Sequence, residues 1–138
     1  MPERREIGHA EARGLVAMVA DRLEANGQGA AVAVVDRHGE LVAFLRTDGC
    51  GLASINIAIN KAFTAARERV ESSVLGERSR TEGFPLTNFG DPRYTGWGGG
   101  VPIIVDGAVI GAIGVSGLPE ANDVELARWA AASLAAAG

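Results

Sequence analysis

The sequence predicts an α+β domain in which helices pack on an antiparallel sheet. Two pairs of short apolar segments, each pair joined by a tight turn, indicate two β-hairpins. Three longer segments have apolar residues at helical spacing, and they flank and separate the hairpins without a strand–helix–strand repeat. Because hairpin strands pair with their neighbours in the sequence, the sheet is expected to be antiparallel.

The N-terminal part contains one helix and one hairpin. Residues 9–25 carry apolar side chains at helical spacing, and Gly27 follows as a stop signal. Residues 30–36 and residues 41–46 are short apolar runs on either side of a polar turn. We therefore expect a helix followed by two antiparallel strands.

A second helix is expected over residues 52–75, followed by a long connection. Apolar side chains recur along the helical segment as a stripe. Residues 76–100 have no such period and contain several proline and glycine turn signals. Connections of this length in a compact domain are usually functional or mobile, so we interpret this one as a binding loop with a short helical turn inside.

The C-terminal part contains a second hairpin and a last helix. Residues 101–105 and 108–115 flank Asp106 and Gly107, a pair that strongly favours a two-residue turn. The smaller face of the second strand is expected to consist of Ala108, Ile110, Ala112 and Gly114. Such a face lets a helix or a ligand approach the backbone closely. Residues 120–136 are expected to form the last helix.

The composition narrows the class of protein. A chain of 138 residues fits a single domain over residues 1–138. The net charge of −4 and the scattered arginines argue against nucleic-acid binding, which needs a face rich in cations. The charged start has no signal-peptide pattern, no apolar run is long enough to span a membrane, and Cys50 is the single cysteine. We therefore expect a cytoplasmic protein that binds neither nucleic acid nor membrane.

Patterns typical of catalytic or metal sites are sparse. His9 and His38 lack Cys, His or carboxylate partners at ligand spacing, so no metal site is expected. Ser116 is not part of a Gly-x-Ser-x-Gly motif, and it either caps the last helix or lines a binding site. No neighbouring His or Lys would activate Cys50 as a thiolate.

A polar stripe on the second helix is a stronger candidate for a site. Asn60, Lys61 and Thr64 lie within about one helical turn of each other, and Arg67 extends the stripe. A solvated helix face has the same appearance, but an amide, a hydroxyl and a cation together can also bind a carboxylate or propionate group. Arg46, at the end of the preceding strand, either completes such a pocket or is simply exposed.

The loop before the second hairpin supplies a glycine run and a tryptophan. Gly98, Gly99 and Gly100 lead into a strand and match neither a Walker A loop nor a dinucleotide fingerprint. They form either a tight turn or a backbone surface whose N–H groups bind a flat or anionic ligand. Trp97 could stack on such a ligand.

Three other side chains in this loop favour an enzyme. Asp91 or Tyr94 could act as an acid or base, while Arg93 and Lys61 hold a carboxylate. The alternative for Asp91, which precedes a proline, is an ordinary turn.

Taken together, these segments resemble the GlcG/HbpS-like, or haem-degrading-domain, family. The motifs that carry the resemblance are VVDRHGELVAFLRTDG at 34–49, KAFTA at 61–65, GGGVPI at 98–103, and IGAIGVSG at 110–117 with Asp123 downstream. They occur in order and cover nearly the whole chain.

The resemblance implies a three-layer α-β-α, profilin-like arrangement around an antiparallel sheet of about five strands. It also implies a homo-oligomer, a dimer or larger, and haem binding by several members. A haem site would need an axial ligand, for which Thr64, His9 and His38 are the candidates.

Several function hypotheses follow. The first is a protein that binds a small molecule, haem or a related planar anionic ligand, between the Lys61 helix and the run Gly98–Gly100; this pocket could be shared across a dimer interface. The second is an isomerase- or lyase-type enzyme that acts on a small carboxylate or enol by proton transfer, which predicts perturbed pKa values around Lys61, Arg93 and Tyr94 in an enclosed cleft. The third is a structural partner subunit with a large apolar interface at Trp97 or Trp129.

Overall fold

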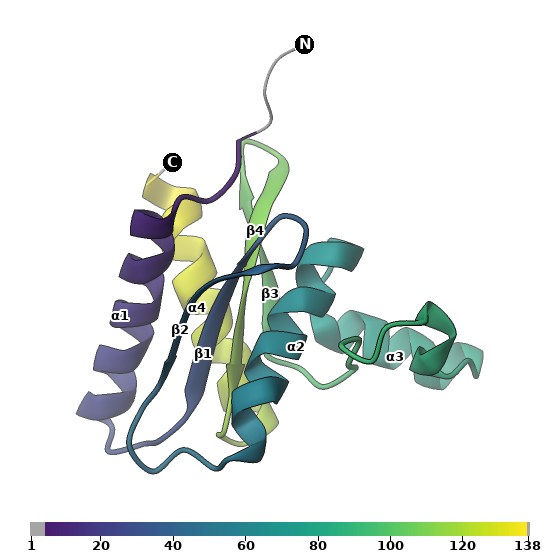
Figure 1. Ribbon diagram of the computed structural model, residues 1–138, viewed down its shortest axis with the longest axis horizontal. Coiled ribbons are helices and arrows are strands. Elements are labelled where there is room, and N and C mark those ends of the chain that lie inside the picture. Colours follow the sequence, from purple (N-terminus) through teal and green to yellow (C-terminus); the bar gives the residue numbers. More distant parts are fainter. Residues whose placement is uncertain (1–4, 138) are drawn as a thin grey trace.

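The computed structural model describes residues 5–137, which form one antiparallel sheet between two layers of helices (Figure 1). The elements in chain order are α1 (His9–Ala25), β1 (Ala31–Asp36), β2 (Leu41–Arg46), α2 (Ala53–Glu68), α3 (Ser72–Glu82), the 3-10 helix η1 (Leu86–Phe89), β3 (Gly100–Val105), β4 (Ala108–Ser116) and α4 (Glu120–Ala137). The first four residues, which include most of the charged start, lie outside the described residues. No described helix has the length and apolar character needed to cross a membrane.

The sheet has four strands in the order β2-β1-β4-β3, and every neighbouring pair is antiparallel. Both predicted hairpins are confirmed, and β1 pairs with β4 to join them into one sheet. The expectation of about five strands is slightly too high. The long segment between α2 and β3, where a further strand could have formed, contains the helices α3 and η1 instead.

The two faces of the sheet are covered differently. Helices α1 and α4 pack on one face, and α2 packs on the other, with α3 projecting to one side of α2 (Figure 1). The α1–α4 side contains the larger core of valine, leucine and isoleucine side chains. The α2 side is lined mainly by alanine from both the strands and the helix.

Small residues let α2 lie directly on the sheet, as the sequence predicts. A Cβ atom on Gly114 would lie 2.1 Å from the carbonyl oxygen of Ala58, and one on Gly100 would lie 2.1 Å from that of Lys61. Because a side chain at either position would push the helix away, these glycines allow α2 to lie close to the sheet. The close packing carries Lys61 to the end of β4.

The predicted helix over residues 52–75 is in fact two helices. Helix α2 ends at Glu68 because Arg69 adopts a left-handed conformation with φ of 59°, and α3 begins three residues later. A left-handed non-glycine residue breaks a helix without leaving a signal in the apolar pattern. The rest of α3 and all of η1 lie within the segment expected to be a loop, so the short helical turn predicted there is confirmed.

One strand residue lies on the other face from that predicted. Ile103 pairs with Gly111 and Ile104 pairs with Val109, so the register skips Ile110 at a bulge. The bulge turns Ile110 into the core beneath α1 and α4. The expectation that Ile110 belongs to the smaller face is therefore wrong.

Candidate functional site

A buried ion pair joins α2 to the start of α4. The side chain of Lys61 is 2% exposed, and its Nζ donates hydrogen bonds to the carbonyl oxygen of Val115 at 2.9 Å and to Oδ2 of Asp123 at 3.2 Å. Asp123 is also buried, and its Oδ1 accepts a hydrogen bond from the backbone N–H of Leu118 at 3.0 Å. An ammonium group has three protons, and these two bonds use two of them.

Burial is the main influence on the charge of this pair. It raises the pKa of Asp123 above the ordinary value, and the neighbouring Lys61 charge and the Leu118 N–H oppose that shift. The carboxyl group is thus easier to protonate than one in water. The backbone and ion-pair contacts fix it in place, which combines a perturbed pKa with a defined position.

The pair lies in the wall of an open hollow of about 370 Å3. This volume falls within the range of about 300–1,000 Å3 that is typical of small-molecule sites. Trp97 stands at the hollow with 59% of its surface exposed, and Ser116 ends β4 beside it. The complete lining is Ser54, Ile57, Lys61, Trp97, Ser116, Gly117, Leu118, Glu120 and Asp123.

Three predicted site residues therefore meet here, namely Lys61, Trp97 and Ser116. The sequence does not single out Asp123 and Glu120 as site residues, because acidic residues in a first helical turn are explained by the helix dipole alone. The motif containing Asp123 was the only signal in the sequence that could have pointed to it. Ser54 and Ile57 on α2 had no separate signal.

Two backbone N–H groups of the glycine run form hydrogen bonds with side chains of the protein itself. The N–H of Gly98 donates to Oε2 of Glu120 at 2.6 Å, and the N–H of Gly100 donates to Oγ of Ser72 at 2.9 Å. All three glycines of the run are buried. Gly98 and Gly100 thus use their N–H groups within the protein and do not present them to a ligand.

Thr64 holds the loop that leads to Trp97. Its Oγ1 donates to the carbonyl oxygen of Asn60 at 2.8 Å and accepts from the backbone N–H of Thr95 at 3.0 Å. The side chain is fully buried, and neither Thr64 nor Asn60 lines the hollow. The polar stripe on the second helix is therefore partly buried, and Thr64 acts as an anchor for the loop.

Asp91, Arg93 and Tyr94 form a separate cluster over α2. The guanidinium of Arg93 binds both carboxylate oxygens of Asp91 and lies 3.9 Å from the centre of the Phe63 ring. The Tyr94 ring stacks on Phe89 with a centroid distance of 4.3 Å. None of the three predicted residues lines the hollow, so the structure does not bring them together with Lys61 in one cavity.

The pKa shifts in this cluster follow from its own contacts. Hydrogen bonds from Arg93 lower the pKa of Asp91, and burial followed by the negative charge of Glu68 raises the pKa of Tyr94. Both shifts oppose proton transfer near neutral pH, because Asp91 is held ionised and Tyr94 is held protonated. The cluster is best explained as packing that fixes the loop.

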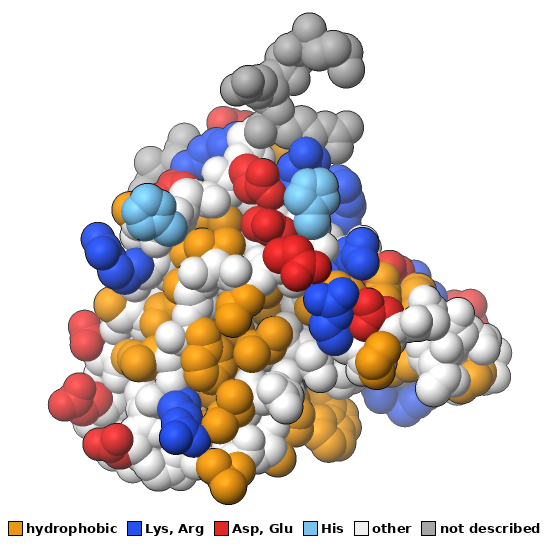
Figure 2. Space-filling model, in the orientation of Figure 1, with side chains coloured by type: hydrophobic (Ala, Val, Ile, Leu, Met, Phe, Trp, Pro, Cys, Tyr) orange, Lys and Arg blue, Asp and Glu red, His pale blue; other side chains and the backbone are white. Residues whose placement is uncertain are grey.

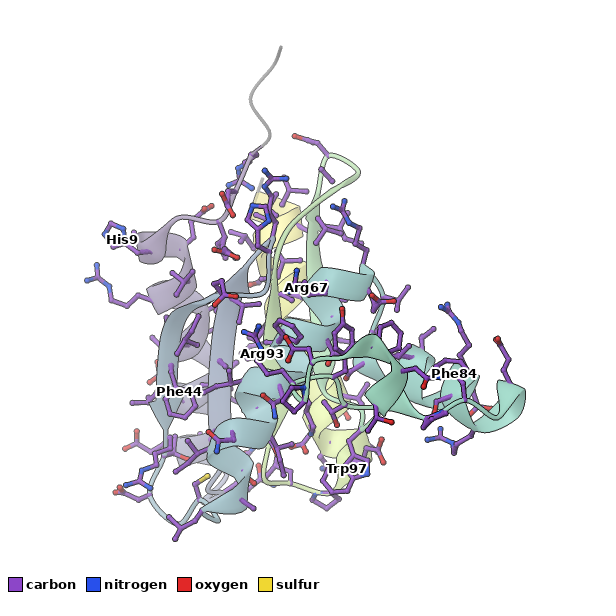
Figure 3. All side chains as sticks on the ribbon, turned by 45° about the vertical axis from the view of Figure 1, so that its right-hand side comes forward. His9, Phe44, Arg67, Phe84, Arg93 and Trp97 are labelled. Atoms are coloured by element: carbon purple, nitrogen blue, oxygen red, sulfur yellow. The ribbon has the colours of Figure 1, made fainter. Side chains whose placement is uncertain are left out.

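The remaining candidates lie elsewhere. Arg46 is exposed and lines a small hollow with Cys50, whose thiol pKa is raised by burial. His9 is exposed at the end of the molecule opposite to Trp97 (Figure 3), and His38 is exposed in the β1–β2 turn. Within residues 5–137 no three His, Cys, Asp or Glu side chains gather as a metal site.

Residues 7–132 match the model of the family described as haem degrading protein HbpS-like. The chain belongs to the HbpS-like family. It is 37% identical to the protein GlcG of Escherichia coli K12 over 124 residues, which is 90% of this chain and 91% of GlcG.

Solved structures agree with this membership. A double mutant of Streptomyces reticuli HbpS is 32% identical with a TM-score of 0.85, and the match covers 97% of this chain and 90% of that one. A complex of PduOC with haem has a TM-score of 0.83 and covers 93% and 94% of the two chains. At 24% identity, PduOC shows a shared fold only.

Proposed function

We propose that this chain is a small-molecule-binding protein that holds its ligand in the hollow beside Lys61, Asp123 and Trp97. The observation that carries the proposal is the buried Lys61–Asp123 pair in the wall of an open cavity, with one ammonium proton left over. A flat part of the ligand would lie against the exposed indole of Trp97, and an acceptor atom would take the free proton of Lys61.

Haem, or a related planar anionic molecule, is the ligand class that the family description and the PduOC complex suggest. The hollow fits this group in part. It offers an aromatic face and hydrogen-bond donors, but its described lining has no imidazole, thiolate, thioether or phenol, the usual axial ligands of haem iron. The proposal therefore assigns no iron ligand to this hollow.

The charges of the lining limit how an acid group would be bound. Lys61 and Asp123 neutralise each other, and Glu120 adds a negative charge that is held by the N–H of Gly98. A ligand carboxylate would be bound by hydrogen bonds from Lys61 and the serine hydroxyls, without a net positive field. Its affinity is thus expected to depend only weakly on salt.

A haemin titration followed by absorbance tests the proposal. We expect a saturable shift of the Soret band with one ligand per site, weakened at least about ten-fold in Trp97→Ala, which removes a side chain that is mostly exposed. His9→Ala, at the opposite end of the molecule, is the matched control and should bind like the wild type. Non-saturating uptake, equal in all three proteins, would refute haem as the ligand.

A second candidate function is proton transfer on a small carboxylate or enol. The raised pKa of Asp123 beside a lysine at an open hollow favours it. In this proposal Asp123 takes the place of Asp91 and Tyr94 as the acid or base, and Lys61 binds the substrate oxygen. Exchange of substrate C–H protons in D2O, lost in Asp123→Asn, would support this activity; exchange unchanged in that variant would exclude it.

A further inference from the structure

The charges around the hollow beside Lys61 do not balance. Lys61 is the single positively charged residue in the described lining, and the buried carboxylate of Asp123 already pairs with it at 3.2 Å. Glu120 is the remaining charged residue of the lining, and it forms no ion pair within residues 5–137. The hollow is therefore bordered by one uncompensated negative charge, on an exposed side chain.

One oxygen of the Glu120 carboxylate is held by the protein and the other is open. Oε2 accepts a hydrogen bond from the N–H of Gly98 at 2.6 Å, whereas no donor in the described chain binds Oε1. Gly98 directly follows Trp97 in the chain, so this hydrogen bond holds the carboxylate close to the segment that carries the indole. Glu120 and Trp97 accordingly border the same hollow.

The ring of Trp97 has no aromatic or cationic partner among the described residues. It is 59% exposed and forms neither an aromatic pair nor a contact with an arginine or lysine. The other tryptophan differs, because the guanidinium of Arg22 lies 3.9 Å from the centre of the Trp129 ring. Most Lys and Arg side chains in Figure 2 lie in the upper part of the view, away from the end that carries Trp97 in Figure 3. The face of an indole attracts cations, so a ligand can supply the cation that the protein does not.

We infer that the ligand of this hollow carries a positively charged nitrogen, a protonated or quaternary amine, held between the indole of Trp97 and the open oxygen of Glu120. The inference rests on the proposed function, because it names the class of ligand for the same hollow. An aromatic face attracts an alkylammonium ion without a hydrogen bond, and a carboxylate adds the opposite charge. Any acid group on the same molecule would bind at Lys61. The hollow thus suits a ligand with charges of both signs better than one with acid groups alone.

The indole N–H signals of the full-length protein, followed by nuclear magnetic resonance, test this inference. The chain has two tryptophans, so the signal of Trp129 is an internal reference for that of Trp97. The probes are choline and its uncharged isostere, 3,3-dimethylbutan-1-ol. We expect choline to shift the Trp97 signal saturably, to leave the Trp129 signal unchanged, and to bind at least about ten-fold more tightly than the isostere.

Two variants of α4 test the role of the carboxylate. Glu120→Gln removes the negative charge but keeps an oxygen that can accept from the N–H of Gly98. It should weaken choline binding about five-fold or more and leave the isostere unaffected. Glu125→Gln removes a charge from the same helix outside the hollow and is the matched control, which should bind choline like the wild type. Circular dichroism checks that both variants are folded. Equal affinities for choline and the isostere, or equal losses in the two variants, would overturn the inference.

Haemin separates this inference from the proposed function. If haemin broadens the Trp97 signal selectively and choline leaves it unchanged, the hollow binds a ligand but not a cation, and the inference alone fails. If neither molecule affects the Trp97 signal, the proposed site fails together with the inference.

Discussion

Lys61 and Asp123 are 62 residues apart in the sequence, yet Nζ of one lies 3.2 Å from Oδ2 of the other. They belong to helices on opposite faces of the sheet, and they meet past the end of β4, where Lys61 also binds the carbonyl oxygen of Val115. The pair thus ties the two helical layers together at the same place where it borders the hollow.

Removing one member of the pair should be costly for stability. Lys61→Met is expected to lower the free energy of unfolding by about 3–5 kcal/mol, because the Asp123 carboxylate stays buried without its partner. Urea denaturation measures the change. The double variant Lys61→Met/Asp123→Asn should lose less than the sum of the two single changes, since it buries no unpaired charge. A strictly additive loss would mean that the two side chains do not stabilise each other.

The raised pKa of Asp123 gives stability a defined dependence on pH. A carboxyl group with a higher pKa in the folded state binds its proton more tightly when folded. Its contribution is fully present below the unfolded-state pKa of about 3.9 and is lost as the pH rises through the folded-state pKa.

Accordingly, the stability of the wild type relative to Asp123→Asn should decrease as the pH rises across the acidic range. Urea denaturation at a series of pH values gives this difference. A difference that grows with pH would show that pairing with Lys61, and not burial, dominates the pKa of Asp123.

The sequence predicts the elements of this fold well because their signals are local. Asp106 and Gly107 specify a hairpin turn by their own conformational preferences, and Asp106 has the positive φ expected of such a turn. Arg69 also has a positive φ, but arginine has no preference for it. Because no residue preference marks that conformation, the end of α2 could not be predicted from the residues around it.

The site was predictable only in part for a related reason. Spacing along a helix shows that Lys61 and Thr64 share a region of its surface, but not that both point into the protein. Arg93 and Tyr94 are close to Trp97 in the sequence, yet their rings and charges pack over α2 while Trp97 lies at the hollow. Which loop residues face a cavity depends on contacts with elements that are distant in the sequence. These contacts cannot be deduced from a single sequence.

The close packing of α2 on the sheet should depend on the absence of a side chain at Gly114. In Gly114→Ala the new Cβ would lie 2.1 Å from the carbonyl oxygen of Ala58, and relieving this clash requires the helix to move. We expect the free energy of unfolding to fall by about 3 kcal/mol, measured by urea denaturation. Gly14→Ala is the control: nothing lies within 4 Å of that position in α1, so the change should stabilise the protein by about 0.5–1 kcal/mol. Equal effects at the two positions would contradict the close packing.

The position of the loop that carries Trp97 should depend on the buried hydroxyl of Ser72. Oγ of Ser72 donates to the carbonyl oxygen of Trp97 at 2.7 Å and accepts from the N–H of Gly100 at 2.9 Å, so Ser72→Ala leaves both backbone groups without this partner. We expect a loss of about 1–3 kcal/mol and faster hydrogen exchange at the Gly100 amide. Thr81→Ala, on the exposed side of the same helix, should cost less than about 0.5 kcal/mol and leave that amide protected. Exchange of the Gly100 amide at the wild-type rate in Ser72→Ala would show that the Ser72 hydroxyl does not hold the loop beside the hollow. The position of Trp97 would then be set by the packing of the glycines alone.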